Sequence, residues 1–179
     1  MASAMALISS YTAPAGGKSG GVTFSAIPAT YTHLYVLISA RGDRTGPSDD
    51  MSVVINSSSS YSNVRLYAQS PNTSSGSANA DGGSSSSNNY SGVITGNSAA
   101  TSEFGITEFW IPNYTLASRS KVVAGNGVAR PYANGFQNDF TQLTTDVTGA
   151  VTSITFDCYN TNRVFSQGST FYLFGISNA

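Results

Sequence analysis

The sequence is poor in ionisable side chains and contains almost no cysteine or histidine. Only 9% of its 179 residues are Asp, Glu, Lys or Arg, and it has one histidine, His33, and one cysteine, Cys158. Globular domains average about 25% charged residues, so neutral hydroxyl and amide groups must cover most of the surface. A single cysteine excludes an intrachain disulfide and is typical of a reducing compartment. We interpret Cys158 as a small strand residue and not as a nucleophile.

The sequence also lacks clustered charge and long apolar runs. The net charge is −1, and the eight Lys and Arg residues form no basic stripe, so no nucleic-acid partner is predicted. Apolar runs such as Leu34–Ile38 are far shorter than the roughly 20 residues that cross a bilayer. The segment Met1–Ser10 has none of the basic residues that begin a secretory signal. We therefore expect a soluble chain that does not insert into a membrane.

No motif in the chain predicts a catalytic residue, a cofactor or a metal. Gly17-Lys18-Ser19 resembles the end of a phosphate-binding loop, but the required first glycine would fall at Thr12 and no helix pattern follows. We interpret Gly16–Gly21 as a turn between strands. A serine nucleophile would need His33, which we expect to be structural, and no Gly-x-Ser-x-Gly elbow occurs. The spacings of zinc and calcium ligands are also missing.

One enzymatic alternative stays open, a small carbohydrate-cleaving enzyme. Glycosidases use two converging carboxylates, and Glu103 with Glu108 could supply them. The other candidate acids are Asp139, Asp146 and Asp157. On a strand, the odd spacing of the two glutamates directs them to opposite faces. The sequence therefore favours a protein without enzymatic activity.

Two short surface motifs are explained by local chemistry and chance. Arg41-Gly42-Asp43 is a tripeptide that some adhesion receptors bind, yet a strand that ends in Gly-Asp before Gly46-Pro47 is ordinary turn sequence. Glycosylation sequons matter only in a secreted eukaryotic chain, and a sequence rich in Asn, Ser and Thr contains them by chance. They occur at Asn56, Asn72, Asn89 and Asn113.

The residues that are abundant favour strands. The chain is 40% hydrophobic, with ten Tyr and nine Phe, and short runs of Val, Ile, Tyr, Phe and Thr end at Gly, Pro, Asn or Ser. No segment predicts a long helix. The predicted strands are Met5–Tyr11, Gly21–Ser25, His33–Arg41, Met51–Asn56, Asn63–Ala68, Gly92–Thr95, Phe104–Ile111, Lys121–Asn126, Thr141–Thr145, Val151–Tyr159 and Thr170–Ile176.

Two of these runs indicate where they lie in a sheet. His33–Arg41 carries apolar residues at both alternating sets of positions, which predicts a central strand. In Val151–Tyr159 one set is apolar and the other is mostly polar, which predicts a sheet with one solvated face.

The segment Ser57–Ser102 is of low complexity. Because strands resume at Gly92, we expect Ser70–Asn89, rich in Ser, Gly and Asn, to be a long exposed loop inside one domain that spans residues 1–179. Such loops often carry binding functions. Many short strands without βαβ alternation predict a two-sheet antiparallel β-sandwich that resembles a jelly roll.

Tyrosines are spread over predicted strands and loops. We expect some to lie in the core and the rest to suit an interface that buries rings and hydroxyls without desolvating charges. They include Tyr11, Tyr31, Tyr61, Tyr67, Tyr90, Tyr114, Tyr132 and Tyr159.

Both ends and the middle of the chain resemble a family of small virion proteins of tailed bacteriophages. The shared features are a Met-Ala-rich opening strand (Met1–Ser10), the stretch Val22–Arg41 (VTFSAIPATYTHLYVLISAR), the segment Ile111–Tyr114 (IPNY) and the ending Ser169–Ile176 (STFYLFGI). Phe174 stands where the family more often has tyrosine. The Ser57–Ser102 region is similar in composition only.

The resemblance implies a β-sandwich particle protein without catalysis, often trimeric. It would be made in the bacterial cytoplasm and reside in the virion. The leading expectation is a head decoration (cement) protein that contacts the major capsid protein, other virion proteins and its own copies. The alternative is a tail-fibre or baseplate adhesin that binds a host-surface glycan or protein through Ser70–Asn89 and exposed tyrosines.

Overall fold

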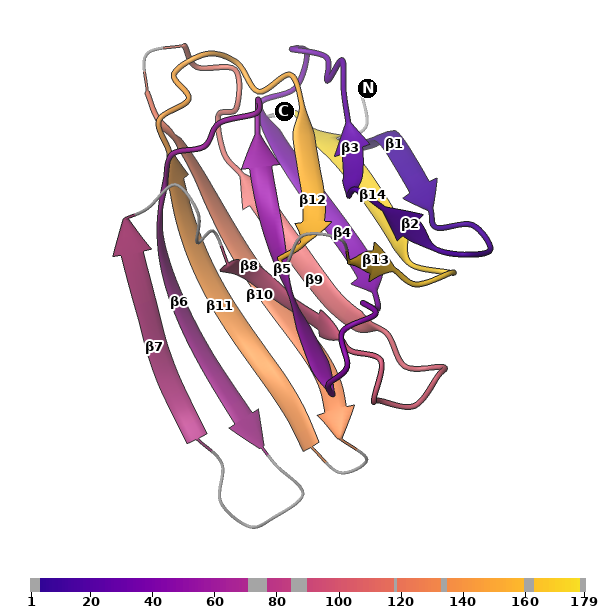
Figure 1. Ribbon diagram of the computed structural model, residues 1–179. Helices are drawn as coiled ribbons and strands as arrows, with labels where there is room; N and C mark the ends of the chain where they lie inside the picture. Colours follow the sequence, from indigo (N-terminus) through magenta and orange to yellow (C-terminus); the bar gives the residue numbers. More distant parts are fainter. Residues whose placement is uncertain are drawn as a thin grey trace.

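The structure is a computed structural model that describes residues 4–70, 77–84, 90–117, 119–132, 135–159 and 163–177. Within these ranges the chain is all-β, and two of its sheets pack face to face as a sandwich (Figure 1). None of the described segments forms a helix, so none offers a helix that is long and apolar enough to cross a bilayer.

The larger sheet has eight antiparallel strands. In spatial order they are β1 (Met5–Thr12), β14 (Thr170–Ile176), β4 (His33–Ala40), β9 (Gly105–Ile111), β10 (Lys121–Tyr132), β11 (Gly135–Thr145), β6 (Tyr61–Ser70) and β7 (Ser77–Ser84).

The smaller sheet has four antiparallel strands, and a two-stranded ribbon lies beside it. The order in the smaller sheet is β3 (Val22–Phe24), β12 (Ile154–Cys158), β5 (Ser48–Ile55) and β8 (Tyr90–Thr95). The ribbon pairs β2 (Lys18–Ser19) with β13 (Val164–Phe165).

The burial patterns confirm both predictions from alternation. In β4, which lies between β14 and β9, every second residue from Leu34 to Ala40 is fully buried and the others are partly exposed. In β12, Ile154, Phe156 and Cys158 are buried, whereas the side chains between them are partly exposed. The central position of β4 and the one solvated face of the smaller sheet are therefore as expected.

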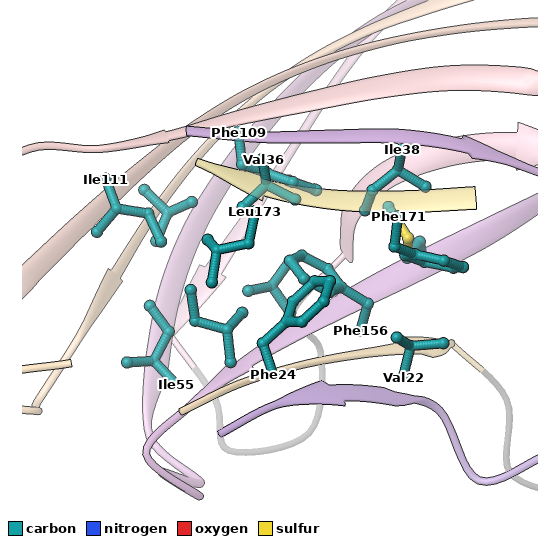
Figure 2. Close-up of a cluster of buried hydrophobic side chains, with 14 of the residues drawn as sticks. Val22, Phe24, Val36, Ile38, Ile55, Phe109, Ile111, Phe156, Phe171 and Leu173 are labelled. Carbon is teal, nitrogen blue, oxygen red and sulfur yellow. The ribbon is translucent and has the colours of Figure 1, made fainter. Parts of the chain in front are cut away.

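The core lies between the two sheets and is built from apolar side chains of both (Figure 2). Phe156 of β12 occupies its centre: the Phe156 ring centroid lies 6.3 Å from that of Phe24, 5.6 Å from that of Phe109 and 6.2 Å from that of Phe171. Phe109 and Phe171 belong to the larger sheet, so this cluster joins the two layers. Interlocked rings of this kind stabilise beyond their buried area.

The two sheets come closest where β8 crosses β9 and β10. A Cβ at Gly92 of β8 would lie 2.7 Å from Cγ2 of Thr107 in β9, and a Cβ at Gly105 of β9 would lie 3.0 Å from Cα of Ile94 and from the backbone N of Thr95 in β8. The Thr107 hydroxyl donates a hydrogen bond across the gap to the carbonyl oxygen of Val93, at 2.9 Å. Only glycine allows backbones to approach this closely.

Each of the eleven predicted strands coincides with a strand of the structure, but three strands were missed. β2 and β13 are two-residue strands, too short for a periodic signal. β7 lies inside Ser70–Asn89, so the prediction of one continuous loop is wrong for residues 77–84. Residues 71–76 and 85–89 of that segment lie outside the described ranges. The small residues of β7 carry little strand signal, and pairing with β6 over eight residues defines the strand instead.

Two strands, β10 and β11, are about twice as long as predicted. The expected Lys121–Asn126 and Thr141–Thr145 are parts of β10 and β11, which pair with each other from Lys121 and Thr145 to Tyr132 and Gly135. Glycines at 125 and 127 and the polar residues 137–139 depress local strand propensity. Backbone hydrogen bonds to the neighbouring strands, from β9 to β10 and from β6 to β11, outweigh this low strand propensity.

Truncation of Phe156 tests the core. Phe156→Ala is expected to lower the free energy of unfolding by about 3–5 kcal/mol, because the large cavity that it leaves cannot collapse fully. Thr155→Ala is the control, since this side chain lies on the solvated face and only meets Thr23 in an exposed hydrogen bond of 2.9 Å. It should change stability by less than about 1 kcal/mol in the same urea titration. Equal losses in the two variants would contradict this account of the core.

Candidate functional site

The outer face of the eight-stranded sheet, which points away from the smaller sheet, carries many exposed apolar side chains among neutral polar ones. One row of directly opposed residues runs across all eight strands: Leu7, Phe174, Tyr35, Trp110, Ala124, Gln142, Val64 and Gly82. Opposed residues project to the same side of a sheet. Within the described part of the chain, ten of the eleven exposed large hydrophobic side chains belong to this face: Met5, Leu7, Val64, Leu66, Ile106, Trp110, Val122, Val128, Phe136 and Phe140.

The outer face carries few ionisable groups. Among the described residues, strand alternation places one carboxylate, Glu108, on it, and the Tyr35 hydroxyl donates a hydrogen bond of 2.6 Å to Glu108 Oε2. Burial, followed by this hydrogen bond and the nearby negative charge, raises the pKa of Tyr35 to about 12. The phenol therefore stays a neutral donor that satisfies the one acidic group at the centre of the face.

Shallow hollows interrupt this face at two places. One has a volume of about 430 Å³ and lies among Leu66, Ala80 and Phe140. The other, of about 320 Å³, lies between Tyr35, Trp110 and Ala124. Both are lined mainly by apolar atoms, so they could receive protruding apolar side chains of a partner.

The outer face is large enough for a stable protein contact. Eight strands spaced by about 4.8 Å and seven to twelve residues long at about 3.3 Å per residue give a face of roughly 900–1,500 Å². A standard interface buries about 800 Å² of each partner. The size and composition of this face thus identify it as the candidate functional surface.

The structure separates the carboxylates considered for a glycosidase. Glu103 precedes β9, so the argument from alternation along one strand does not apply to it, and it forms an ion pair with Arg130 at 3.5 Å. Glu108 lies on the outer face. Asp139 is buried on the inner face, where it binds Arg65 at 2.5 Å. Asp157 lies on the other sheet.

The tripeptide Arg41-Gly42-Asp43 is part of the framework. Arg41 is buried, and its guanidinium donates to three carbonyl oxygens of the loop 97–100 at 2.5, 2.9 and 2.9 Å. The Asp43 carboxylate accepts a hydrogen bond from the backbone N–H of Val164 at 3.1 Å. The segment is not a turn as predicted, because Arg41 and Gly42 form single β-bridges with Thr95 and Phe165. The buried Arg41 side chain holds a loop in place.

The lone histidine and the lone cysteine both have local contacts in the sandwich. Nδ1 of His33 accepts a hydrogen bond from the backbone N–H of Asn113 at 3.0 Å, and its ring lies against Trp110. Cys158 is buried, and burial together with nearby carboxylates raises the pKa of its thiol. A thiol held protonated is a poor nucleophile.

Other predicted positions have local roles. Gly17 has a positive φ, a Cβ there would lie 2.5 Å from Val164, and its backbone N–H closes a turn onto the carbonyl oxygen of Pro14 at 2.9 Å. Lys18 and Ser19 then form β2, so the prediction of a turn over Gly16–Gly21 is wrong for these two residues. The Asn56 side chain accepts hydrogen bonds from the backbone N–H groups of Thr152 and Ser153 at 2.8 and 3.0 Å. The sequons at Asn72 and Asn89 lie outside the described residues.

The tyrosines divide as expected between core and surface. Tyr61 and Tyr114 are buried; the Tyr61 hydroxyl donates to the carbonyl oxygen of Ser58 at 2.9 Å, and the Tyr114 hydroxyl donates to that of Pro28. The partly exposed tyrosines include Tyr67 and Tyr90.

No group of three or more potential metal ligands occurs among residues 4–70, 77–84 and the other described ranges. The outer apolar face is the feature that the sequence interpretation missed. Its signal was present in Ile106 and Trp110, and again in Phe136 and Phe140, where apolar residues occupy the positions between buried ones. Searches for similar family models, curated proteins and solved structures found no match to this chain.

A buried carboxyl group, that of Asp49, makes the stability of the protein depend on pH. Asp49 of β5 is fully buried, and its Oδ2 has no hydrogen-bond partner among the described residues. The nearest cation is Arg163, at 3.9 Å, and Gly42 leaves no room beside the carboxyl, since a Cβ there would lie 2.3 Å from Oδ2. Burial raises the pKa of Asp49 to about 6. The tight packing argues against a ligand site.

Replacement of Asp49 tests this assignment. Between about pH 4 and pH 6 the folded state holds a proton that the unfolded chain releases, so stability falls as pH rises, by up to about 1.4 kcal/mol per unit. Urea titrations at several pH values give the free energy of unfolding as a function of pH. Asp49→Asn should remove the part of this pH dependence that comes from Asp49. Other carboxyls with a raised pKa, such as Asp157, contribute equally to the pH dependence of stability in the wild type and in the variant. An unchanged slope in the variant would contradict the assignment.

Proposed function

We propose that the chain is a non-enzymatic structural subunit of a bacteriophage particle, most simply a decoration or cement protein of the head. In this role it resides in the virion and binds capsid subunits and its own copies. The observation that carries the proposal is the outer face of the eight-stranded sheet. It is broad, apolar and nearly free of charge, as a permanent contact surface is. The resemblance of both chain ends to small phage virion proteins supports the same role.

The neutrality of the surface suits lasting assembly. Burial of an unpaired charge costs several kcal/mol per ion, whereas uncharged rings, hydroxyls and amides can be buried with little penalty once they are paired. The outer face offers such groups in rows, and its one acidic side chain, Glu108, is already paired with Tyr35. Contact with another subunit would therefore leave few groups unsatisfied.

The strand order supports a jelly-roll framework, which we include in the proposal. Four neighbouring strands of the larger sheet, in the order β1-β14-β4-β9, share the sandwich with β3-β12-β5-β8. Eight strands in two sheets of four, with the chain crossing between the sheets, are the arrangement found in many viral capsid domains. The strands β10, β11, β6 and β7 then extend one sheet and enlarge the outer face.

The proposed assembly is a homotrimer. The number of copies is inferred from the resemblance to phage virion proteins, which are often trimeric. The outer face supplies a surface through which the copies can contact each other. In a cyclic trimer each subunit uses one patch to contact a different patch of its neighbour. A measured mass distinguishes this from a dimer in which two outer faces meet.

The alternative role is an adhesin domain of a tail fibre or baseplate that binds a host-surface glycan or protein. Its predicted contact segment, Ser70–Asn89, contains the edge strand β7. An edge strand with free backbone groups can pair with another chain, which would suit a cementing role as well. The position of the protein on the particle separates the two roles.

Particle composition tests the proposed location. Cryo-electron microscopy of the virion, combined with mass spectrometry of separated heads and tails, should find the chain on the capsid surface in many copies. Detection on tails alone would support the adhesin role instead. Absence from the particle would refute both.

Self-association tests the proposed contact face. The double variant Ile106→Thr and Phe140→Thr replaces two side chains that are 56% and 55% exposed with a residue that also favours strands. The change should weaken self-association by about 30-fold, because each contact loses apolar burial of roughly 1 kcal/mol at each of the two side chains, about 2 kcal/mol in all. Analytical ultracentrifugation over a concentration series measures the effect.

Leu116 provides the matched control. It is 48% exposed but lies outside the strands of the outer face, so Leu116→Thr should leave self-association unchanged. A wild-type chain that stays monomeric at its highest soluble concentration would contradict the proposed contact. So would equal effects of the double variant and the Leu116 variant.

A further inference from the structure

A second surface lies on the inner face of the larger sheet, where the smaller sheet no longer covers it. Residues of β6 and β11 line an open cleft together with residues 44–47, which precede β5, and Ser48, the first residue of β5. The cleft has a volume of about 410 Å³ and is lined mainly by polar atoms. This volume lies within the range of small-molecule sites, about 300–1,000 Å³.

A continuous chain of hydrogen bonds and ion pairs forms the floor of the cleft. Gln69 Nε2 donates to Gln137 Oε1 at 2.8 Å, and Gln137 Nε2 donates to Asp139 Oδ1 at 3.1 Å. Arg65 donates to Asp139 Oδ2 through Nε at 2.9 Å and through a terminal nitrogen at 2.5 Å. The same terminal nitrogen of Arg65 lies 2.9 Å from Asp50 Oδ1. Because each side chain fixes the next, the polar groups of the floor are held in place.

The charges of the cleft cancel. Arg65 is paired with Asp139 and Asp50, and Arg44 lies 3.4 Å from the second oxygen of Asp50. Two guanidinium groups therefore face two carboxylates. An anion would have to compete with the carboxylates for the arginines, and a cation would have to compete with the arginines, so the cleft favours an uncharged ligand.

Several polar groups in the cleft keep free hydrogen-bonding capacity. Within the described part of the chain, the Tyr67 hydroxyl and the Gln69 amide oxygen take part in no hydrogen bond, although both residues line the cleft. Thr45 and Ser48, whose side chains carry hydroxyls, also line the cleft. The Tyr67 ring packs against the Arg65 guanidinium, 4.9 Å from its centroid, so the phenol is held beside the charged floor.

We propose that this cleft binds a neutral saccharide. A sugar presents hydroxyl groups in several directions, and each can both donate and accept a hydrogen bond. The cleft offers fixed amides, hydroxyls, paired carboxylates and guanidinium groups around one space. It has little apolar lining that could hold a hydrophobic side chain of a peptide. Binding here is independent of self-association, because the cleft and the outer face lie on opposite sides of the larger sheet.

An NMR titration of the full chain tests the proposal. The probes are glucose, galactose, mannose, N-acetylglucosamine, lactose and maltose, with glucuronic acid and glucosamine as charged probes. At least one neutral sugar should shift the side-chain amide signals of Gln69 and Gln137 in a saturable way. The absence of such a shift with every neutral probe, or stronger binding of a charged probe, would overturn the proposal.

Three variants locate the binding. Tyr67→Phe removes a hydroxyl that has no partner among the described residues, and Gln69→Ala removes an amide of the floor. Each should weaken binding of the sugar by about tenfold, the effect expected when a good hydrogen bond is lost. Gln142→Ala is the control, since it removes the same amide as Gln69→Ala from the outer face, and it should leave binding unchanged.

Backbone amide spectra of the variants separate loss of binding from loss of fold. The core signals, such as those of Phe156 and Leu173, should stay in place in all three proteins. Unchanged affinity in both Tyr67→Phe and Gln69→Ala would overturn the proposal, because the sugar would then bind elsewhere. The sugar titrations do not test the outer contact face, because analytical ultracentrifugation tests self-association separately.

Discussion

The close contact of β8 with β9 and β10 fixes how the two sheets meet, and the other surfaces of the protein depend on it. At Gly92 a Cβ would collide with the Thr107 side chain, and at Gly105 it would press against the backbone of β8. The Thr107 hydroxyl also bonds directly to Val93 across the gap. On one side of this contact the sheets diverge enough to hold the aromatic core around Phe156 (Figure 2). On the other side the smaller sheet ends, because β8 is its last strand. Four strands thus cover only part of one face of an eight-stranded sheet.

The uncovered parts of the larger sheet differ because their surroundings differ. At the ends of β6 and β11 the inner face has no strand opposite it, and Arg65, Asp139 and Gln137 stabilise it as a paired polar network instead of an apolar core. None of the described strands covers the outer face, yet it keeps apolar residues in register across the strands. Polar groups that pair with each other suit a small ligand, whereas an apolar face of this breadth suits another protein. Our two proposals follow this division.

Alternation identified the strands whose environments differ between their two faces. β4 and β12 were predicted with their central and half-solvated positions, and β14 was predicted with its observed bounds. It failed for β7, whose small residues gain a strand conformation only from pairing with β6. It also failed for the first half of β11, where Gln137 and Asp139 face inward although they are polar. Sequence spacing gives no sign that Arg65, 74 residues away, neutralises Asp139.

The sequence by itself determined the fold class and limited the chemistry. Strand periodicity and turn residues are local properties, so an all-β sandwich follows from them, and the scarcity of charged groups is a property of composition. The tertiary structure decided which apolar residues stay exposed and which charges pair. Burial depends on the strand that lies opposite in space. Ile106 and Phe109 are similar in hydrophobicity and lie on the same strand, but one faces solvent and the other the core, because only the inner side of β9 meets the second sheet.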